Sequence, residues 1–131
     1  MKVPHLPARR LLPLFALLAI LQGCSRSDKP VHGAAVFRQC ASCHQVGVNA
    51  RGGFGPQLNG LFGRRAGSTA DFAYSPAMKA SGIVWDEQTL AHFLADPDKV
   101  VPGTRMRFWG IGDEREMRAL LAYLRGFQDA H

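Results

Sequence analysis

An unbroken run of apolar residues near the start of the chain is its first recognisable pattern. Residues 11–21 carry no charge, and a basic segment containing Lys2, Arg9 and Arg10 precedes them. A run of this length fits the apolar core of an export signal, which spans about 7–15 residues, whereas a membrane-spanning helix needs about 20. We therefore expect residues 1–23 to be a signal peptide, with an uncleaved membrane anchor as the alternative.

Helical periodicity is clearest near the C-terminus. Asp113 lies three residues before Glu116, a pairing that resembles a capping box at the start of a helix. An apolar stripe at helical spacing follows, formed by Met117, Leu120, Leu121 and Leu124. The pattern predicts a helix that begins after Asp113, buries this stripe and weakens at Gly126.

Three further helical segments are predicted upstream. Residues 31–41 combine Ala with long side chains and lead into a pair of cysteines. Residues 75–80 suit a short helix, because Pro76 is well placed in a first turn. Asp86 is positioned to cap a helix over residues 86–95, which the Asp-Pro pair at 96–97 should stop.

The segment between the cysteine pair and these helices is rich in glycine. Residues 45–69 contain seven glycines and one proline, with few strand-like runs. Such a composition favours a backbone that wraps around something. The fold class is therefore a small all-α domain of three to four helices joined by Gly-rich loops. So much loop buries little apolar surface, a deficit that a large apolar cofactor would offset.

Charge narrows the range of partners. The 131 residues include 16 Lys and Arg and 10 Asp and Glu, but three of the basic residues lie in the expected signal, which leaves 13 against 10. No basic stripe interleaved with aromatics is present in the sequence. We therefore expect no nucleic-acid partner.

The signal ends in a sequence that resembles a bacterial lipobox. Leu21-Gln22-Gly23-Cys24 would be cut before Cys24, whose sulfur would carry a lipid, although Gln22 is not the usual small or apolar residue. A lipid would also protect an exported thiol from oxidation or mispairing. We expect lipidation of Cys24, a linker over residues 24–30 and a domain over residues 31–131. The lipid would hold the exported domain on the periplasmic or extracytoplasmic side of a membrane. An ordinary signal with an incidental cysteine is the alternative.

The motif Cys40-Ala41-Ser42-Cys43-His44 carries the chemistry of the chain. In C-x-x-C-H, two sulfurs one turn apart can add to the vinyl groups of a haem, and the adjacent histidine can bind its iron. A thioredoxin-like pair would need a nearby βαβ pattern, and a structural zinc would need four ligands. A disulfide would leave His44 without a role. The motif predicts one covalent haem c with His44 on its iron.

The opposite side of the iron needs a second ligand or stays open. The candidates are Met78, Met106, Met117, His32, His92 and His131. Met106 stands apart because Pro102 and Gly103 constrain the loop that holds it. Met117 belongs to the helical stripe and is expected in the core, and His92 lies within a predicted helix.

From about Gly33 to Leu124 the chain resembles a small class I cytochrome c of the mitochondrial type. The matching stretches are residues 40–44 (CASCH), 55–64 (GPQLNGLFGR), 82–85 (GIVW), 102–106 (PGTRM) and 121–124 (LAYL). The resemblance implies the cytochrome c fold around one covalent haem, with His44 and Met106 as axial ligands. It also implies that the Pro56 carbonyl accepts a hydrogen bond from His44.

The resemblance assigns further roles to polar and packing residues. It implies that Arg64, Tyr74 and Trp85 hydrogen-bond or stabilise the inner haem propionate. It also implies that the first helix packs on the last, through Gly33, Phe37, Tyr123 and Leu124.

Three departures from the family pattern affect the expectations. Phe93 stands where a tyrosine is frequent and Met78 where an asparagine is frequent, so we expect a drier pocket on the Met106 side. Residues 96–99 (DPDK) stand where the family often has lysines, so the partners of those relatives are not carried over.

These expectations define a function. Ligation by His44 and Met106 would close the iron to substrates, so the chain is expected to be a single-electron carrier and no enzyme, with no small-molecule substrate. Its expected partners are redox proteins, namely membrane-associated oxidoreductases or oxidases. The rivals are an open-site haem enzyme or sensor, such as a peroxidase or gas-binding protein, and a fixed cytochrome subunit of a larger oxidoreductase.

Overall fold

The computed structural model describes residues 29–130. The predicted signal peptide, the lipid on Cys24 and most of the linker lie outside the described residues, as does the candidate ligand His131.

Five helices make up the regular structure of the described part. They are α1 (Gly33–Phe37), α2 (Pro76–Ala80), α3 (Glu87–Ala95), α4 (Pro97–Val100) and α5 (Glu114–Arg125). Residues 29–130 contain no strand, and one isolated antiparallel bridge joins Arg65 to Val84. The all-α prediction is confirmed, but five helices replace the expected three to four.

The additional helix is α4, a single turn at the Asp-Pro pair expected only to stop α3. Asp96 ends α3 in an extended conformation, and its carboxylate then accepts a hydrogen bond from the backbone N–H of Lys99 at 3.2 Å. Pro97 occupies the first turn of α4, where its missing N–H costs nothing. The same two residues therefore end one helix and begin the next.

The first helix is shorter than residues 31–41. His32 precedes it in an extended conformation, and the chain beyond Phe37 continues in turns. The N–H of Cys40 donates to the Phe37 carbonyl at 2.8 Å, and the N–H of Cys43 donates to the Cys40 carbonyl at 3.0 Å. These bonds span three residues rather than four, so the segment that carries the cysteines is a series of turns after α1.

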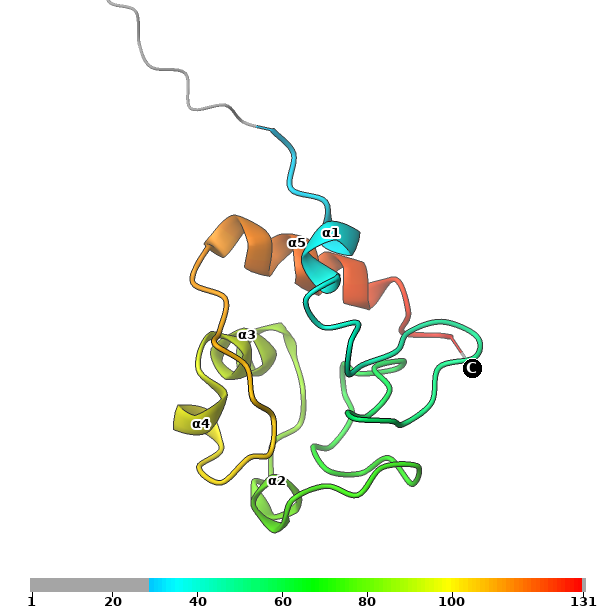
Figure 1. Cartoon of the computed structure of the whole chain (residues 1–131), viewed down its shortest axis with the longest axis vertical. Helices are drawn as coiled ribbons and strands as arrows, with labels where there is room; N and C mark the ends of the chain where they lie inside the picture. The colour runs from blue at the N-terminus through cyan, green and yellow to red at the C-terminus, as the bar shows by residue number, and fades with distance from the viewer. Residues whose placement is uncertain (1–28, 131) are drawn as a thin grey trace, which may run out of the picture.

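The helices form a frame around a central space, as Figure 1 shows. Helix α5 lies against α1 at one end, α3 and α4 lie along one side, and α2 lies at the other end. The loops over residues 38–75 close the remaining side. Elements far apart in the sequence thus face the same interior.

The predicted contact between the first and last helices is confirmed. A Cβ atom on Gly33 would overlap the Ala119 carbonyl oxygen and lie 2.5 Å from Tyr123 Cβ, so only glycine allows this close approach. The rings of Phe37 and Tyr123 pack with their centroids 5.3 Å apart. All four residues of the predicted apolar stripe on α5 are buried.

Local caps set the other helix boundaries. Asp113 accepts hydrogen bonds from the N–H groups of Arg115 and Glu116, at 2.7 and 3.0 Å, as expected for the start of α5. Ser75 caps α2 by accepting from the Met78 N–H at 3.1 Å.

None of the helices within residues 29–130 has the length and apolar character needed to cross a membrane.

Candidate cofactor site

A cavity of about 390 Å³ lies inside the frame of helices and loops. All eight residues that the sequence assigned to a cofactor line this cavity: Cys40, Cys43, His44, Pro56, Arg64, Tyr74, Trp85 and Met106. The fold therefore brings together residues from four separate parts of the chain. Their individual roles toward a cofactor stay predictions.

His44 is held in one orientation by a backbone carbonyl. Its Nδ1 lies 2.8 Å from the Pro56 oxygen, which can only accept, so Nδ1 carries the proton. Nε2 of the neutral ring is then left with a free lone pair. Burial lowers the pKa of His44, and the hydrogen bond to Pro56 opposes this only in part. The imidazole therefore favours its neutral, metal-binding form.

Gly55 allows the loop to lie flat against this ring. A Cβ atom there would be 2.5 Å from His44 Cε1 and 2.8 Å from His44 Nδ1. The Gly55 N–H donates to the Cys43 carbonyl at 2.9 Å, which ties the loop back to the cysteine pair. One glycine thus fixes the distance between the Pro56 carbonyl and the imidazole.

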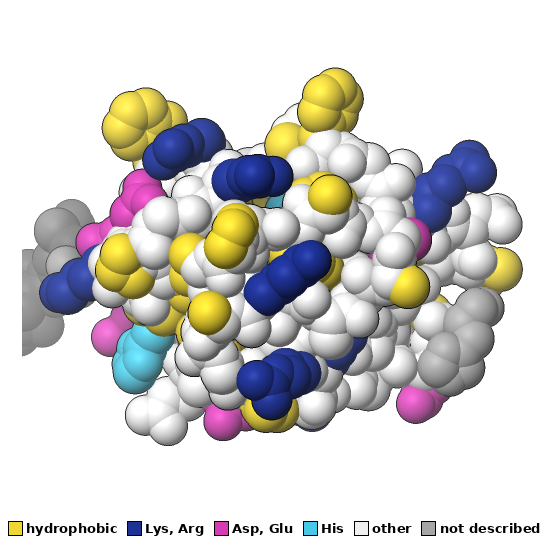
Figure 2. Space-filling model, turned by 90° about the horizontal axis from the view of Figure 1, so that it is seen from below, with side chains coloured by type: hydrophobic (Ala, Val, Ile, Leu, Met, Phe, Trp, Pro, Cys, Tyr) yellow, Lys and Arg dark blue, Asp and Glu magenta, His cyan; other side chains and the backbone are white. Residues whose placement is uncertain are grey.

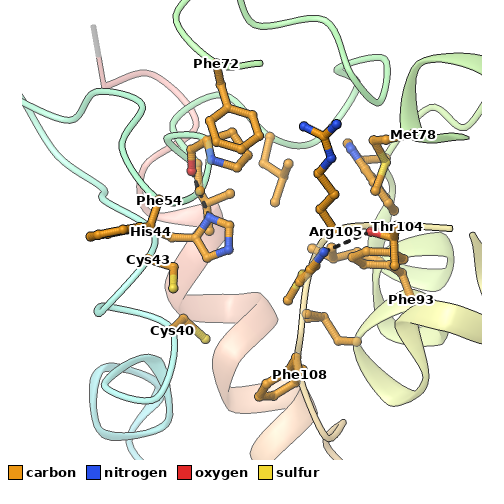
Figure 3. Close-up of a pocket in the computed structure, with 18 of the residues that line it drawn as sticks. Cys40, Cys43, His44, Phe54, Phe72, Met78, Phe93, Thr104, Arg105 and Phe108 are labelled. Carbon is orange, nitrogen blue, oxygen red and sulfur yellow. Dashed lines mark hydrogen bonds between the residues drawn. The ribbon is translucent and has the colours of Figure 1, made fainter. Parts of the chain in front are cut away.

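The two cysteines lie on the same wall as His44, as Figure 3 shows. They are not bridged to each other. Cys40 is half-buried and Cys43 is exposed, and burial, then the neighbouring Cys43, raises the pKa of the Cys40 thiol. Both sulfurs and the imidazole are therefore presented together at one side of the cavity.

The wall across the cavity from His44 is largely apolar. Figure 3 shows Thr104, Phe108, Phe93 and Met78 on this side. Phe93 and Met78 are buried. The two departures from the family pattern thus place apolar side chains in this wall.

Met106 lies in the chain between Thr104 and Phe108 of this wall, and it lines the cavity and is half-buried. Its backbone N–H lies 3.3 Å from the hydroxyl of Thr104, which is buried and accepts the hydrogen bond. Gly103 supplies the left-handed turn (φ of 87°) that precedes this segment. The loop that the sequence singled out is constrained in the structure.

Arg64 lines the cavity and also forms hydrogen bonds to the loop that precedes it in the chain. Its guanidinium donates to the Asn59 carbonyl at 2.8 Å and to the Gln57 carbonyl at 3.0 Å. Burial lowers the pKa of Arg64, and the nearby Tyr74 and Asp71 oppose the shift. The predicted contact of Arg64 with a propionate would add to these bonds.

Tyr74 and Trp85 also line the cavity, and both are engaged with the protein. The Tyr74 hydroxyl lies 2.8 Å from the Thr69 hydroxyl. The Trp85 ring is buried and packs on Phe93 with centroids 5.2 Å apart. Core packing accounts for part of the role of both residues, as the sequence allowed.

Several residues of the cavity were not singled out from the sequence. Four of them are Phe54, Phe72, Arg105 and Phe108. All four lie in irregular segments, where no periodicity indicates which side chains face inward. Their closeness in sequence to Gly55, Tyr74 and Met106 is the signal that could have found them.

The donor set fits one kind of cofactor. Two unbridged thiols one turn apart, a fixed neutral imidazole and a largely apolar lining suit a planar apolar ring that carries a metal. The arrangement is that of a protein with a covalently attached haem.

Comparison with known proteins places the chain among such proteins. A family model described as Cytochrome c matches residues 30–128. The cytochrome c2 of Blastochloris viridis is 43% identical over 114 residues, which cover 87% of this chain and 89% of that protein. The cytochrome c2 of Rhodoplanes tepidamans is 50% identical over 95 residues, covering 72% of this chain and 89% of that protein.

A solved structure shares the fold. Cytochrome cH from Methylobacterium extorquens superposes with a TM-score of 0.67 at 43% identity, covering 72% of this chain and 94% of that one. The chain belongs to the cytochrome c family, its fold is the small cytochrome c fold, and its cofactor is one covalent haem c.

Proposed function

We propose that this protein is a single-electron carrier that shuttles electrons between membrane-associated redox complexes, with haem c attached through Cys40 and Cys43. The haem supplies the one-electron chemistry. The observation that carries the proposal is the fixed His44 ring, which shares a cavity with Met106 in the opposite wall. The cytochromes c2 among its relatives support the same function.

His44 and Met106 are the proposed axial ligands of the iron. The bond between His44 Nδ1–H and the Pro56 carbonyl orients the ring and raises the basicity of Nε2. Met106 would supply a thioether, a soft ligand that favours ferrous iron and raises the reduction potential. Two protein ligands would leave no open position, so Met106 would exclude substrates from the metal.

Arg64, Tyr74 and Trp85 are proposed to stabilise the inner propionate. An uncompensated carboxylate inside the protein would be costly, because it loses its hydration. Arg64 lines the cavity and uses only part of its donor capacity on the Asn59 and Gln57 carbonyls. Its remaining N–H groups are available for such a partner.

The proposed location is the periplasmic side of a membrane, with a lipid on Cys24. From Cys24 to the described domain the linker reaches at most about 25 Å. Arg115 donates to the Lys29 carbonyl at 2.7 Å, so the linker joins the domain at a fixed point beside α5. Such a tether would keep the protein close to membrane-bound partners. A mature protein that starts beyond Cys24, or carries it unmodified, would contradict the anchor.

A redox-titrated visible spectrum of the membrane fraction tests the carrier. The oxidised protein should show the weak far-red band of an iron–thioether bond, and one reversible one-electron transition. Substitution Met106→Leu keeps the volume and removes the thioether, so it should abolish this band, lower the potential and allow the reduced protein to bind CO.

Met117→Leu is the matched control. Met117 is also buried but does not line the cavity, so this variant should keep the band and the potential. If the unaltered protein lacks the band and binds CO rapidly, an open-site enzyme or sensor replaces the carrier. Retention of the band in Met106→Leu would assign the ligand to another residue.

A further inference from the structure

The chain beyond α5 is hydrogen-bonded to the loop over residues 57–64. The side-chain amide of Gln128 accepts from the Phe62 N–H at 3.1 Å and donates to the Phe62 carbonyl at 2.6 Å, across 66 residues of sequence. Next to it, the Gly60 N–H donates to the Phe127 carbonyl at 3.0 Å. Figure 1 shows the C-terminus beside the loops that follow the cysteine pair. The end of the chain therefore holds the backbone of this loop at two points.

Gln128 is itself held in place by the turns that continue α5. Its N–H donates to the Arg125 carbonyl at 3.2 Å, and the ring of the preceding Phe127 packs on the Tyr123 ring with centroids 5.0 Å apart. The Gln128 side chain is half-buried, and both polar groups of its amide are used on Phe62. The amide therefore acts as an additional peptide group that pairs with the loop backbone.

The loop held in this way contains the acceptors of Arg64. Its guanidinium donates to the Asn59 and Gln57 carbonyls, and Asn59 directly precedes Gly60. The backbone N–H of Arg64 donates to the Leu61 carbonyl at 3.1 Å. All three acceptors of Arg64 thus belong to the segment that the chain end contacts.

Other contacts hold the two ends of this loop but leave its middle to the chain end. The Asn59 side chain exchanges two hydrogen bonds of 2.8 Å with the Gly47 backbone, and the Gly63 N–H donates to the Trp85 carbonyl at 2.7 Å. Within residues 29–130, the backbone groups of Phe62 have no hydrogen-bond partner besides Gln128. Loss of this amide would therefore release the middle of the loop first.

The position of Arg64 matters because its charge is partly withdrawn from solvent. Arg64 is half-buried and lines the cofactor cavity. By contrast, the Lys and Arg side chains on the face in Figure 2 stand out into solvent, where dissolved ions screen their charge. The guanidinium of Arg64 is screened less, so a change in its position has a larger effect on a group inside the cavity.

We propose that Gln128 is a positioning residue for electron transfer, which holds the middle of the loop over residues 57–64 and thereby keeps Arg64 at the cofactor cavity. This rests on the proposed electron-carrier function, in which Arg64 stabilises the inner propionate. A cation close to the iron favours the ferrous form, which carries one more electron, and so raises the reduction potential. Gln128 thus sets part of this potential although it does not line the cavity.

The test measures the reduction potential of the full-length holoprotein and of Gln128→Met. Methionine keeps the length of the side chain and removes both hydrogen bonds to Phe62. The potential should fall, so that the ratio of oxidised to reduced protein at a fixed solution potential rises about threefold, equivalent to roughly 28 mV for one electron. The far-red band should stay, because the iron ligands are unchanged. Hydrogen exchange at the Phe62 N–H should become faster, because the loop is released.

Gln88→Met is the matched control. Gln88 is exposed on α3 and its side chain contacts no part of the loop over residues 57–64 through a hydrogen bond in the described part of the chain. Its variant should keep the potential and the exchange rate at Phe62.

A second variant tests whether the effect passes through Arg64. Arg64→Gln removes the charge, so adding Gln128→Met to it should lower the potential no further. The comparison of Gln128→Met with Gln88→Met decides the proposal even where Arg64→Gln gives no holoprotein.

Three outcomes would overturn the positioning role while leaving the carrier function intact. Unchanged exchange at Phe62 in Gln128→Met would show that the amide does not hold the loop. Faster exchange with an unaltered potential would show that Arg64 keeps its place without the chain end. An equal fall in potential with and without Arg64 would show that the effect does not pass through this residue. By contrast, an unaltered protein without a reversible one-electron transition would remove the carrier function, and with it this proposal.

Discussion

The two walls of the cofactor cavity are held in place by different physical means. The His44 wall (Cys40, Cys43, His44, Gly55 and Pro56) is fixed by backbone hydrogen bonds and by one backbone-to-ring contact that only glycine allows. The Met106 wall (Met78, Phe93, Thr104, Met106 and Phe108) is held mainly by apolar packing. This difference predicts that the two walls respond to different kinds of substitution. The His44 wall should not tolerate one added carbon, whereas the Met106 wall should respond chiefly to added polarity.

Gly55→Ala should have the largest effect, because it adds the missing carbon to the His44 wall. The new Cβ would lie 2.5 Å from His44 Cε1 and force the ring away from the Pro56 carbonyl. Overpacking and a lost hydrogen bond together should cost about 2–5 kcal/mol of folding free energy. The measurement is denaturant unfolding of the purified holoprotein, together with its yield.

Gly53→Ala is the control for this change, two residues away on the same loop. Apart from its two chain neighbours, no residue has an atom within 4 Å of the position that its Cβ would take. The free energy of unfolding should change by less than about 0.5 kcal/mol. Equal effects of the two substitutions would mean that loop flexibility, and no contact with His44, explains the need for glycine.

The elements that the sequence predicted well are those with local signals. Asp113 and the stripe on α5 define that helix through their own spacing, and Ser75 with Pro76 does the same for α2. The cysteine pair and His44 are contiguous, so their placement on one wall needed no tertiary information. The prediction failed at α4, because Asp96 caps a new helix after ending the previous one, and sequence signals at an Asp-Pro pair indicate only the stop.

The remaining parts of the site depend on tertiary structure. Nothing near Phe54 in the sequence indicates that it lines the same cavity as Phe108, since 53 residues separate them. The contact of Gly55 with the His44 ring is likewise invisible without the fold, although the Gly-Pro pair marks a turn. The resemblance to cytochromes c identified Pro56 and Met106, which the residue pattern alone left open.

Phe93→Tyr should have an intermediate effect, because it adds polarity to the Met106 wall. Phe93 is buried against Trp85, so a hydroxyl there enters an apolar environment and helps water to reach the proposed thioether ligand. The far-red band should then be lost at a pH lower by about one unit, equivalent to about 1.4 kcal/mol. The measurement is a pH titration of that band in the oxidised protein.

Phe62→Tyr controls for the added hydroxyl. Phe62 lies outside the cavity lining. The guanidinium carbon of Arg125 lies over its ring, 4.5 Å from the ring centroid. In this variant the far-red band should be lost at the same pH as in the unaltered protein. If Phe93→Tyr lost the far-red band at the same pH as the unaltered protein, the apolar character of the Met106 wall would not control the strength of the proposed iron–thioether bond.

Asp86→Asn should have the smallest effect, and its size should depend on pH. Asp86 caps α3, the helix that carries Phe93 into the Met106 wall, and its carboxylate accepts from the Thr89 N–H at 2.7 Å. This bond, then the Thr89 hydroxyl, lowers the pKa of Asp86 from its ordinary value of 3.8. The charge of Asp86 therefore contributes its full stability above pH 3.8, and the contribution is lost as the pH falls through the lower folded value.

Asparagine at position 86 keeps a capping oxygen and loses the charge, so this substitution measures how much the charge on Asp86 stabilises the protein. The melting temperature of Asp86→Asn should be slightly lower than that of the unaltered protein at pH 7, and the difference should close as the pH falls below 3.8. Asp129→Asn removes the same charge at a side chain that caps no described helix, and should leave the transition in place. The His44 wall contains no helix cap, so acid should weaken the Met106 wall first, seen as loss of the far-red band before unfolding. A gap between the two melting curves that stays constant down to pH 2 would show that the charge on Asp86 does not stabilise this wall.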